Sequence, residues 1–245
     1  MKKIIIWGYC NLKLLLSPFK MKINTLSDND MIDYVTKNNL SIIRYGDGEF
    51  RIIETRKGIH YQDFNEELCN EMEEVFYNYS KDSKYFLSIP CFFKENIFWF
   101  KKMPYSFTTC FAKCRLFFRN KHDNDLIYGD AFLFKKNNKK IYEKLWKDEK
   151  KIILIHNDIK WAKSLEQEYG IKVEFIKIPS KNSYDVIDKI ETKIEKINKN
   201  KKTKILRSAG PMAKALCYRL CNKDFIIYDT GHCFDEPLIL EENRK

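Results

Sequence analysis

Residues 151–228 read KIILIHNDIKWAKSLEQEYGIKVEFIKIPSKNSYDVIDKIETKIEKINKNKKTKILRSAGPMAKALCYRLCNKDFIIY and alternate between two patterns. Short apolar runs typical of buried strands cover 151–156, 171–178, 203–206 and 225–228. Segments with apolar residues at helical spacing lie between them, at 161–169, 184–197 and 211–221. Strands that alternate with helices predict an α/β fold, with a mostly parallel sheet, right-handed crossovers and flanking helices.

The alternation continues toward the N-terminus with less regularity. A helix is expected after Ser27, which begins a capping-box-like pattern. Strands are expected over 40–45, 85–89 and 126–134, and helices over 65–79 and 138–146. We expect one domain over 25–240 with an aromatic and basic helical insertion near 91–122. Residues 1–24 are expected to form an N-terminal strand or extension, since the apolar run 4–7 is too short for a signal peptide.

Composition narrows the class of protein only partly. Of the 245 residues 44% are hydrophobic, which is enough for a buried core. The net charge of +11 suits polyanionic partners, although a run such as 193–199 suggests lysines on a solvated helix. The eight cysteines lack C-x-x-C spacing, and we expect reduced thiols in a cytosolic protein. No stretch has the roughly 18 apolar residues of a membrane span.

Polar residues follow four of the predicted strands at the point where each strand ends. These segments are 44–49, 179–182, 207–211 and 229–232. In open α/β sheets, ligands bind at the carboxyl ends of the strands, so the four loops should meet around one site. Their Gly, Ser, Asn, Asp, Glu, His and basic residues suit a nucleotide diphosphate and a divalent metal.

The first of these loops, Gly46 to Glu49, provides the strongest metal signal. Asp47 and Glu49 are separated by one glycine, and a tightly turned backbone lets both carboxylates reach one hard cation. Such a metal bridges diphosphate oxygens and neutralises the leaving group. Arg44 is a candidate for bidentate phosphate binding, and the segment Ser208 to Gly210 precedes a helix whose first amides suit an anion.

The segment Arg44-Tyr45-Gly46-Asp47-Gly48-Glu49-Phe50 closely resembles the Arg-x-Gly-Asp-Gly-Glu motif of the GT-D-type bacterial glycosyltransferases. Three further segments match that family in order. Residues 179–184 resemble its Pro-x-x-Asn-Ala-Phe/Tyr stretch, 208–214 its Gly-Pro-Thr-Ala segment, and 229–232 its Asp-x-Gly-His. The chain departs from the family at Met212, where threonine is common, and at 156–160, which replaces a glycine-rich stretch.

The resemblance implies a Rossmann-like GT-D fold, a nucleotide-sugar donor that is UDP-linked, and a manganese or magnesium ion. It assigns the metal to Asp47 and Glu49, with His232 as a further metal or diphosphate contact. The expected donor-binding residues are Arg44, Gly46, Lys181, Asn182, Ser208, Gly210 and His232.

We therefore expect a glycosyltransferase that acts on a glycan, glycoprotein or lipid-linked saccharide. An inverting reaction needs a carboxylate base, for which Asp235, Glu236 and Asp130 are candidates, and Asp235 is preferred. A metal-dependent phosphohydrolase, a basic nucleic-acid-binding protein and a non-catalytic sugar-nucleotide binder remain alternatives, with nucleic acid the less favoured partner. Residues 91–122 are a candidate for peripheral contact with an anionic membrane, at the inner face of the cell membrane.

Overall fold

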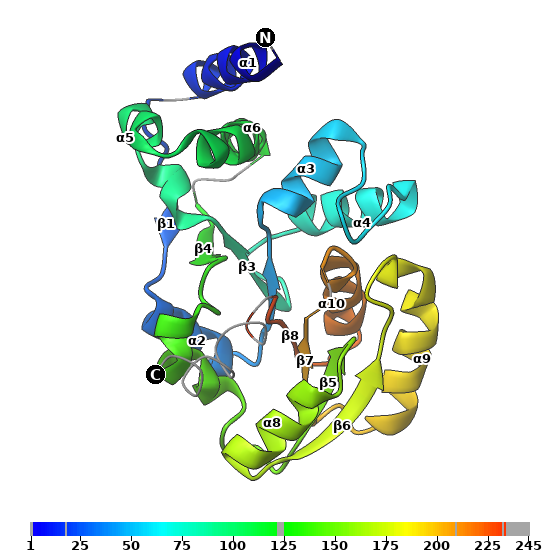
Figure 1. The fold of residues 1–245 in the computed structure, drawn as a ribbon. Coiled ribbons are helices and arrows are strands. Elements are labelled where there is room, and N and C mark those ends of the chain that lie inside the picture. Colours follow the sequence, from blue (N-terminus) through cyan, green and yellow to red (C-terminus); the bar gives the residue numbers. More distant parts are fainter. Residues whose placement is uncertain (1, 18, 122–124, 209, 232, 234–245) are drawn as a thin grey trace, which may run out of the picture.

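The computed structural model describes residues 2–17, 19–121, 125–208, 210–231 and 233. Its centre is an eight-stranded, entirely parallel sheet in the order β1-β4-β3-β2-β8-β7-β5-β6 (Figure 1). The strands are β1 (Asn24–Thr25), β2 (Ser41–Arg44), β3 (Tyr85–Ile89), β4 (Ile127–Asp130), β5 (Lys151–His156), β6 (Lys172–Lys177), β7 (Lys204–Arg207) and β8 (Ile227–Asp229). The α/β class and the mostly parallel sheet are confirmed.

Helices cover both faces of this sheet. The α-helices are α1 (Lys2–Leu16), α2 (Asp28–Lys37), α3 (Asp47–Thr55), α4 (Glu66–Tyr77), α5 (Ile97–Lys102), α6 (Tyr105–Lys121), α7 (Lys139–Tyr142), α8 (Lys160–Tyr169), α9 (Ile187–Ile197) and α10 (Met212–Asn222). Short 3-10 turns are η1 (Cys91–Lys94), η2 (Lys136–Asn138), η3 (Glu143–Leu145) and η4 (Ser183–Val186). Two apolar clusters result, one beneath α3, α4, α6, α9 and α10 and the other beneath α2, α7 and α8.

Local capping explains where several helices begin and end. The Ser27 hydroxyl accepts a hydrogen bond from the Asp30 amide at 3.2 Å, as the capping pattern predicts. The Asn65 side chain caps α4 in the same way, through the Leu68 amide at 2.9 Å. Gly170 ends α8 in the left-handed conformation, with φ of 65°. These signals place the predicted helices within a few residues of the observed ones.

The expected N-terminal strand is wrong. Residues 2–16 form helix α1, which packs on α6 through Cys10 and Leu14. The isoleucines at 4–6 favour a strand locally, but the buried positions 10, 14 and 17 recur at helical spacing. Tertiary packing on α6 therefore decides the conformation.

Two further boundaries differ from expectation. The strand predicted over 126–134 ends at Asp130, because residues 131–134 form turns that bring Phe134 onto the second apolar cluster. The helix predicted over 138–146 is divided into α7 and η3. Residues 91–121 fold as η1, α5 and α6, so the insertion is helical as expected.

Aromatic rings of the insertion form much of its packing. The Phe92 ring contacts those of Trp99, Phe107 and Phe111, with centroid separations between 4.8 and 5.8 Å. Phe118 and Phe93 continue this cluster toward the sheet at 5.8 Å. Most of the aromatic residues in the segment predicted to contact a membrane therefore pack within the protein. None of the described helices combines the length and apolar character needed to cross a membrane.

Candidate active site at the carboxyl ends of the strands

A pocket of about 730 Å³ lies where β2, β5, β6, β7 and β8 end. Six of the predicted site residues line it: Arg44, Gly46, Asp47, Glu49, Ser208 and Gly210. The rest of the lining includes Gly48, Tyr61, Phe132, Phe134, Lys135, His156, Asn157, Pro179, Ser180, Ser183, Lys214 and Gly231. The four loops predicted to converge therefore do so, and the pocket has the size of a small-molecule site.

The acidic segment begins a helix instead of forming a loop, which corrects the sequence-based expectation. Gly46 is the N-cap of α3, and its amide donates to Glu49 Oε2 at 2.8 Å. Neither Gly46 nor Gly48 has positive φ, so the glycines do not form the tight turn that was expected. A side chain on Gly46 would instead meet Glu49 Oε2 at 3.2 Å. The first turn of α3 thus faces the pocket with amide groups that suit an anion.

A buried ionic cluster forms the floor of the pocket. Lys214 Nζ, on α10, lies 2.8 Å from Glu49 Oε1 and 3.1 Å from Asp229 Oδ2. All three side chains are less than a tenth exposed. Burial lowers the pKa of Lys214, but the carboxylates of Asp229 and Glu49 outweigh it and leave the pKa raised. For Asp229 the signs are opposite. Burial raises its pKa, but the positive charges of Lys214 and Arg44 outweigh burial and leave the pKa lowered.

Arg44 is held at the end of β2 by several partners. Its Nε donates to the Asp229 carbonyl at 2.6 Å, and Nη1 donates to the Ala131 carbonyl. Its Nη2 lies 3.7 Å from Asp229 Oδ1, and the guanidinium lies 5.3 Å above the Phe134 ring. A side chain on Gly231 would overlap Nη2, at 1.6 Å. Arg44 therefore keeps only part of its donor set for a ligand, and a bidentate phosphate contact stays a prediction.

The described residues fit a metal less fully than the motif suggests. Both Glu49 oxygens have protein partners, while Asp47 is exposed at the pocket. Within the described ranges, no three His, Cys, Asp or Glu side chains come together as a metal cluster. His232 lies outside the described residues. Of the two predicted metal ligands, Asp47 is therefore the carboxylate exposed at the pocket, and the divalent metal stays a prediction.

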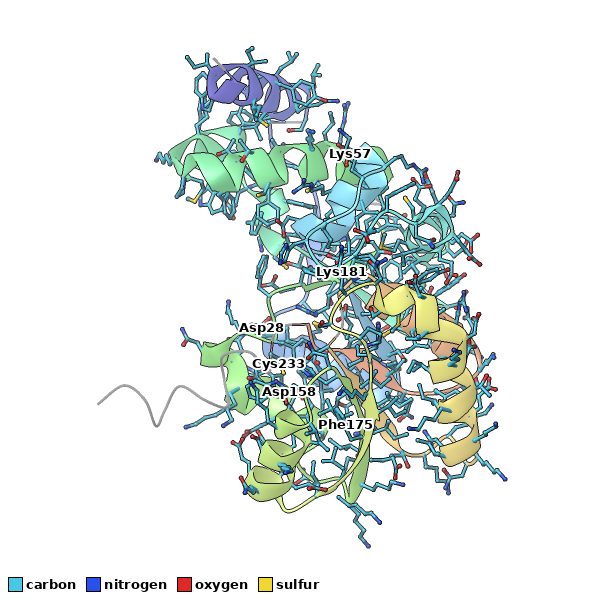
Figure 2. The ribbon with its side chains drawn as sticks, turned by 45° about the vertical axis from the view of Figure 1, so that its right-hand side comes forward. Asp28, Lys57, Asp158, Phe175, Lys181 and Cys233 are labelled. Atoms are coloured by element: carbon cyan, nitrogen blue, oxygen red, sulfur yellow. The ribbon has the colours of Figure 1, made fainter. Side chains whose placement is uncertain are left out.

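Lys181 and Asn182 lie beside the pocket, not in its lining. Both are fixed to Asp63: the Lys181 ammonium at 3.1 Å, and the Asn182 side chain through two hydrogen bonds of 2.8 Å. The backbone N–H of Asn182 also donates to the Tyr61 carbonyl at 3.0 Å. Figure 2 places Lys181 on the loop that leaves the sheet toward α9. Their structural role is to hold residues 61–63, and with them Tyr61, against the site.

The segment around Ser208 leads into α10 as predicted. The Ser208 hydroxyl donates to the Gly231 carbonyl and so connects the loops after β7 and β8. Gly210 has φ of 58°, and a side chain there would collide with the Tyr61 ring at 2.5 Å. Both residues line the pocket. Ser208 therefore lies in the pocket, but its hydroxyl already donates to a protein carbonyl. Its contact with a nucleotide stays a prediction.

The candidate bases have different outcomes. Asp235 and Glu236 lie outside the described residues. Asp130 ends β4, where its Oδ1 accepts the Phe132 amide at 3.1 Å, and it is not in the pocket lining. The structure therefore does not bring Asp130 into the site, and Asp235 stays a prediction.

The sequence analysis gave no role to Lys214, Asp229 or Tyr61, although Asp229 begins one of the four converging loops. Lys214 carried a signal, because it is a charge among Met212, Ala213 and Ala215 at the start of an apolar helix. Burial, then the charge of Glu49, raises the pKa of Tyr61 to about 12, so its hydroxyl stays a donor at neutral pH. Nothing in its own segment marked Tyr61, because it reaches the site through a loop fixed by Asn182.

The fold and the pocket define a class of protein: a Rossmann-like α/β domain with a small-molecule-sized pocket over the ends of its strands. The family model described as the glycosyltransferase GT-D fold matches residues 42–237, and the chain belongs to that family. This confirms the family resemblance drawn from the four motifs.

Related proteins and structures agree with this family. The chain is 26% identical over 225 residues to "Glycosyltransferase GlyD" of Streptococcus pneumoniae serotype 4, covering 85% of this chain and 26% of that protein. It is 25% identical to "Probable glycosyl transferase Gly" of Streptococcus gordonii, covering 91% of this chain and 34% of that protein. The chain thus spans about a quarter to a third of these curated relatives.

Solved structures share the fold. One, described as "The highly conserved domain of unknown function 1792 has a distinct glycosyltransferase fold", aligns with a TM-score of 0.75 and 22% identity, covering 98% of this chain and 85% of that one. Another, described as "A New Glycosyltransferase (DUF1792) from Streptococcus sanguinis", aligns with a TM-score of 0.71 and 23% identity, covering 86% and 82%. The GT-D glycosyltransferase fold is therefore confirmed.

Proposed function

We propose that this protein is a glycosyltransferase that transfers a sugar from a nucleotide-sugar donor, with UDP as the nucleotide. The observation that supports the proposal most is the pocket into which α3 presents its N-terminus and which Arg44 and Lys135 line with positive charge. Helix N-termini and cationic side chains together suit a diphosphate. The family and the names of its relatives point to the same reaction class.

In this proposal the chain's own residues bind and orient the diphosphate. The first amides of α3 and the remaining donors of Arg44 contact phosphate oxygens as negative charge develops on the leaving group. The Tyr61 hydroxyl, which stays protonated, is placed to donate as well. Lys214 stays paired with Glu49 and Asp229, so its charge neutralises part of theirs in the floor and is not counted among the diphosphate contacts.

A divalent cation of the manganese or magnesium type is part of the proposal. Asp47 would hold it, since its carboxylate is exposed to the pocket. When bound, such an ion neutralises charge on the diphosphate. Glu49 contributes directly only if it leaves Lys214. The acceptor in this proposal is a glycan, glycoprotein or lipid-linked saccharide, and Asp235 is the preferred base.

Calorimetric titration of UDP with manganese, and again with EDTA, tests the donor site. We expect metal-dependent binding that falls at least about tenfold in Asp47→Asn, because the ion loses its protein carboxylate. The matched control is Asp33→Asn, an exposed aspartate on α2 outside the pocket. Equal loss in both variants, or no UDP binding in the presence of manganese, would contradict the proposal.

Turnover separates the proposal from hydrolysis. Incubation with UDP-sugars should release UDP faster when a saccharide acceptor is added. Release of inorganic phosphate or a nucleoside monophosphate without an acceptor would instead support a metal-dependent phosphohydrolase.

A further inference from the structure

Helix α1 presents an apolar surface that faces away from the rest of the protein. Its buried positions are Cys10, Leu14 and the adjoining Ser17, which lie along one stripe against α6. At 3.6 residues per turn, Ile5, Leu12 and Leu16 lie on the opposite side. In Figure 1, α1 lies at one end of the molecule over α5 and α6, and Figure 2 shows side chains projecting from it.

This outer face is apolar to an unusual degree for a helix at the protein surface. Eight large apolar side chains of α1 are between 45% and 74% exposed: Ile4, Ile5, Ile6, Trp7, Tyr9, Leu12, Leu15 and Leu16. A helix that is apolar on every side normally lies in a core or in lipid. Phe19 and Phe98 extend the surface, as an edge-to-face pair 5.4 Å apart that is more than half exposed. We define these ten residues as the α1 surface.

Positive charge surrounds the α1 surface. The ammonium groups of Lys13 and Lys113 lie 5.4 and 5.0 Å from the Tyr9 ring, and Lys101 lies 5.9 Å from the Phe98 ring. A lysine beside an aromatic ring keeps its ammonium group in water while its aliphatic stem and the ring are buried against apolar material.

The whole net charge of the protein resides in this region. Residues 1–22 and 91–122 contain 12 Lys and Arg and one acidic residue, Glu95, whereas the other 191 residues contain 33 of each sign. The charge excess therefore does not come from lysines such as those of α9, which has three lysines and three acidic residues. The segments that build α1, α5 and α6 account for the full +11.

We propose that the α1 surface docks on an anionic lipid bilayer, with α1 lying in the interface plane. An apolar face flanked by lysines and carrying Trp7 and Tyr9 has the chemistry of an interfacial helix. Anionic headgroups attract the surrounding lysines, and this attraction falls with salt.

Two other binding partners, a second copy of the chain and nucleic acid, suit the α1 surface less well than a bilayer does. A second copy related by a twofold axis would bring two regions of +11 together, which opposes association. Nucleic acid would satisfy the charge but leave the apolar side chains in water. The proposal also relocates the membrane contact expected for residues 91–122, because most aromatic residues there pack internally.

Flotation with vesicles tests the proposal on the whole chain. The protein should float with vesicles of phosphatidylcholine and phosphatidylglycerol, less with phosphatidylcholine alone, and less as sodium chloride rises. The triple variant Ile5→Ser, Leu12→Ser, Leu16→Ser should partition at least about tenfold more weakly, since inserted apolar area drives partition. The matched control is Ile159→Ser. Ile159 is 52% exposed and lies between β5 and α8, outside the α1 surface, so this variant should float like the wild type.

The fluorescence of Trp7 gives a second readout. It should shift to the blue on adding the anionic vesicles, and Trp7→Phe should abolish that shift. Failure to float, or equal flotation of the triple variant, would overturn the proposal. A dimer in light scattering that the triple variant abolishes, without flotation, would assign the surface to a second copy. Lipid partition needs no nucleotide, so this result is independent of the proposed sugar transfer.

Discussion

Replacing Lys214 with methionine should strongly destabilise the fold, because the change leaves two buried carboxylates without their shared cation. Lys214 Nζ lies 2.8 Å from Glu49 and 3.1 Å from Asp229, and the lysine side chain is 5% exposed. Methionine keeps most of the side-chain volume, so the loss is electrostatic. Breaking a buried ion pair by removing one partner costs roughly 3–5 kcal/mol, against a total stability of about 5–15 kcal/mol.

Urea denaturation followed by tryptophan fluorescence measures this loss. With a urea m-value of about 2–3 kcal/mol/M, the midpoint should fall by roughly 1–2.5 M. The double variant Lys214→Met, Asp229→Asn should recover part of the stability, since one of the two carboxylates that lost Lys214 is then neutral. This comparison keeps the prediction testable even if the single variant folds poorly.

The pH dependence of the loss follows from the pKa shifts. Burial raises the pKa of Asp229, but Lys214 and Arg44 lower it overall below its ordinary 3.8, so its stabilisation is present above that pH and disappears in acid. Burial lowers the pKa of Lys214, yet Asp229 and Glu49 raise it overall above 10.5, so its contribution is complete below 10.5 and is lost as pH rises further. The difference between wild type and variant should therefore be largest between about pH 5 and 10, and should shrink below about pH 4.

A loss below about 1 kcal/mol at pH 7 would refute the reasoning, since that is the size expected of an exposed ion pair. A loss that grows in acid would refute it as well, because protonated carboxylates need no cation.

Three further variants probe other parts of the site. Gly231→Ala should displace the Arg44 guanidinium and weaken UDP binding at least about tenfold in calorimetry, because its side chain would overlap Nη2; unchanged affinity would contradict this. Asn182→Ala should lower the urea midpoint slightly, since two exposed hydrogen bonds to Asp63 disappear; a loss of affinity with unchanged stability would instead indicate a direct nucleotide contact. Glu49→Gln should lower stability by about 1–3 kcal/mol while UDP affinity changes less than in the aspartate variant above; the reverse order would make Glu49 a direct metal ligand.

The sequence predicts the sheet well where strands and helices alternate at regular spacing. Residues 151–228 contain continuous buried strands and amphipathic helices, and each of these elements is observed. The prediction is wrong for α1, because the isoleucines at 4–6 favour a strand locally while contact with α6 favours a helix. Such a contact joins segments about 100 residues apart, so no local pattern contains it.

The candidate site could be placed from sequence but not resolved into roles. The rule that ligands bind where parallel strands end brought Arg44, Asp47 and Ser208 to one pocket. The same rule included Lys181 and Asn182, whose side chains turn to Asp63 instead. A loop's position is fixed by topology, whereas the direction of its side chains depends on partners elsewhere in the chain.

The ionic cluster shows why the metal motif alone was insufficient. Asp47 and Glu49 look equivalent in sequence. Both lie in the first turn of α3, however, and residues two apart on a helix point in different directions. Asp47 therefore faces solvent in the pocket, while Glu49 turns inward to Lys214, 165 residues further along the chain. The two carboxylates of the motif thus have different surroundings: Asp47 is exposed at the pocket, and Glu49 is already paired with a cation.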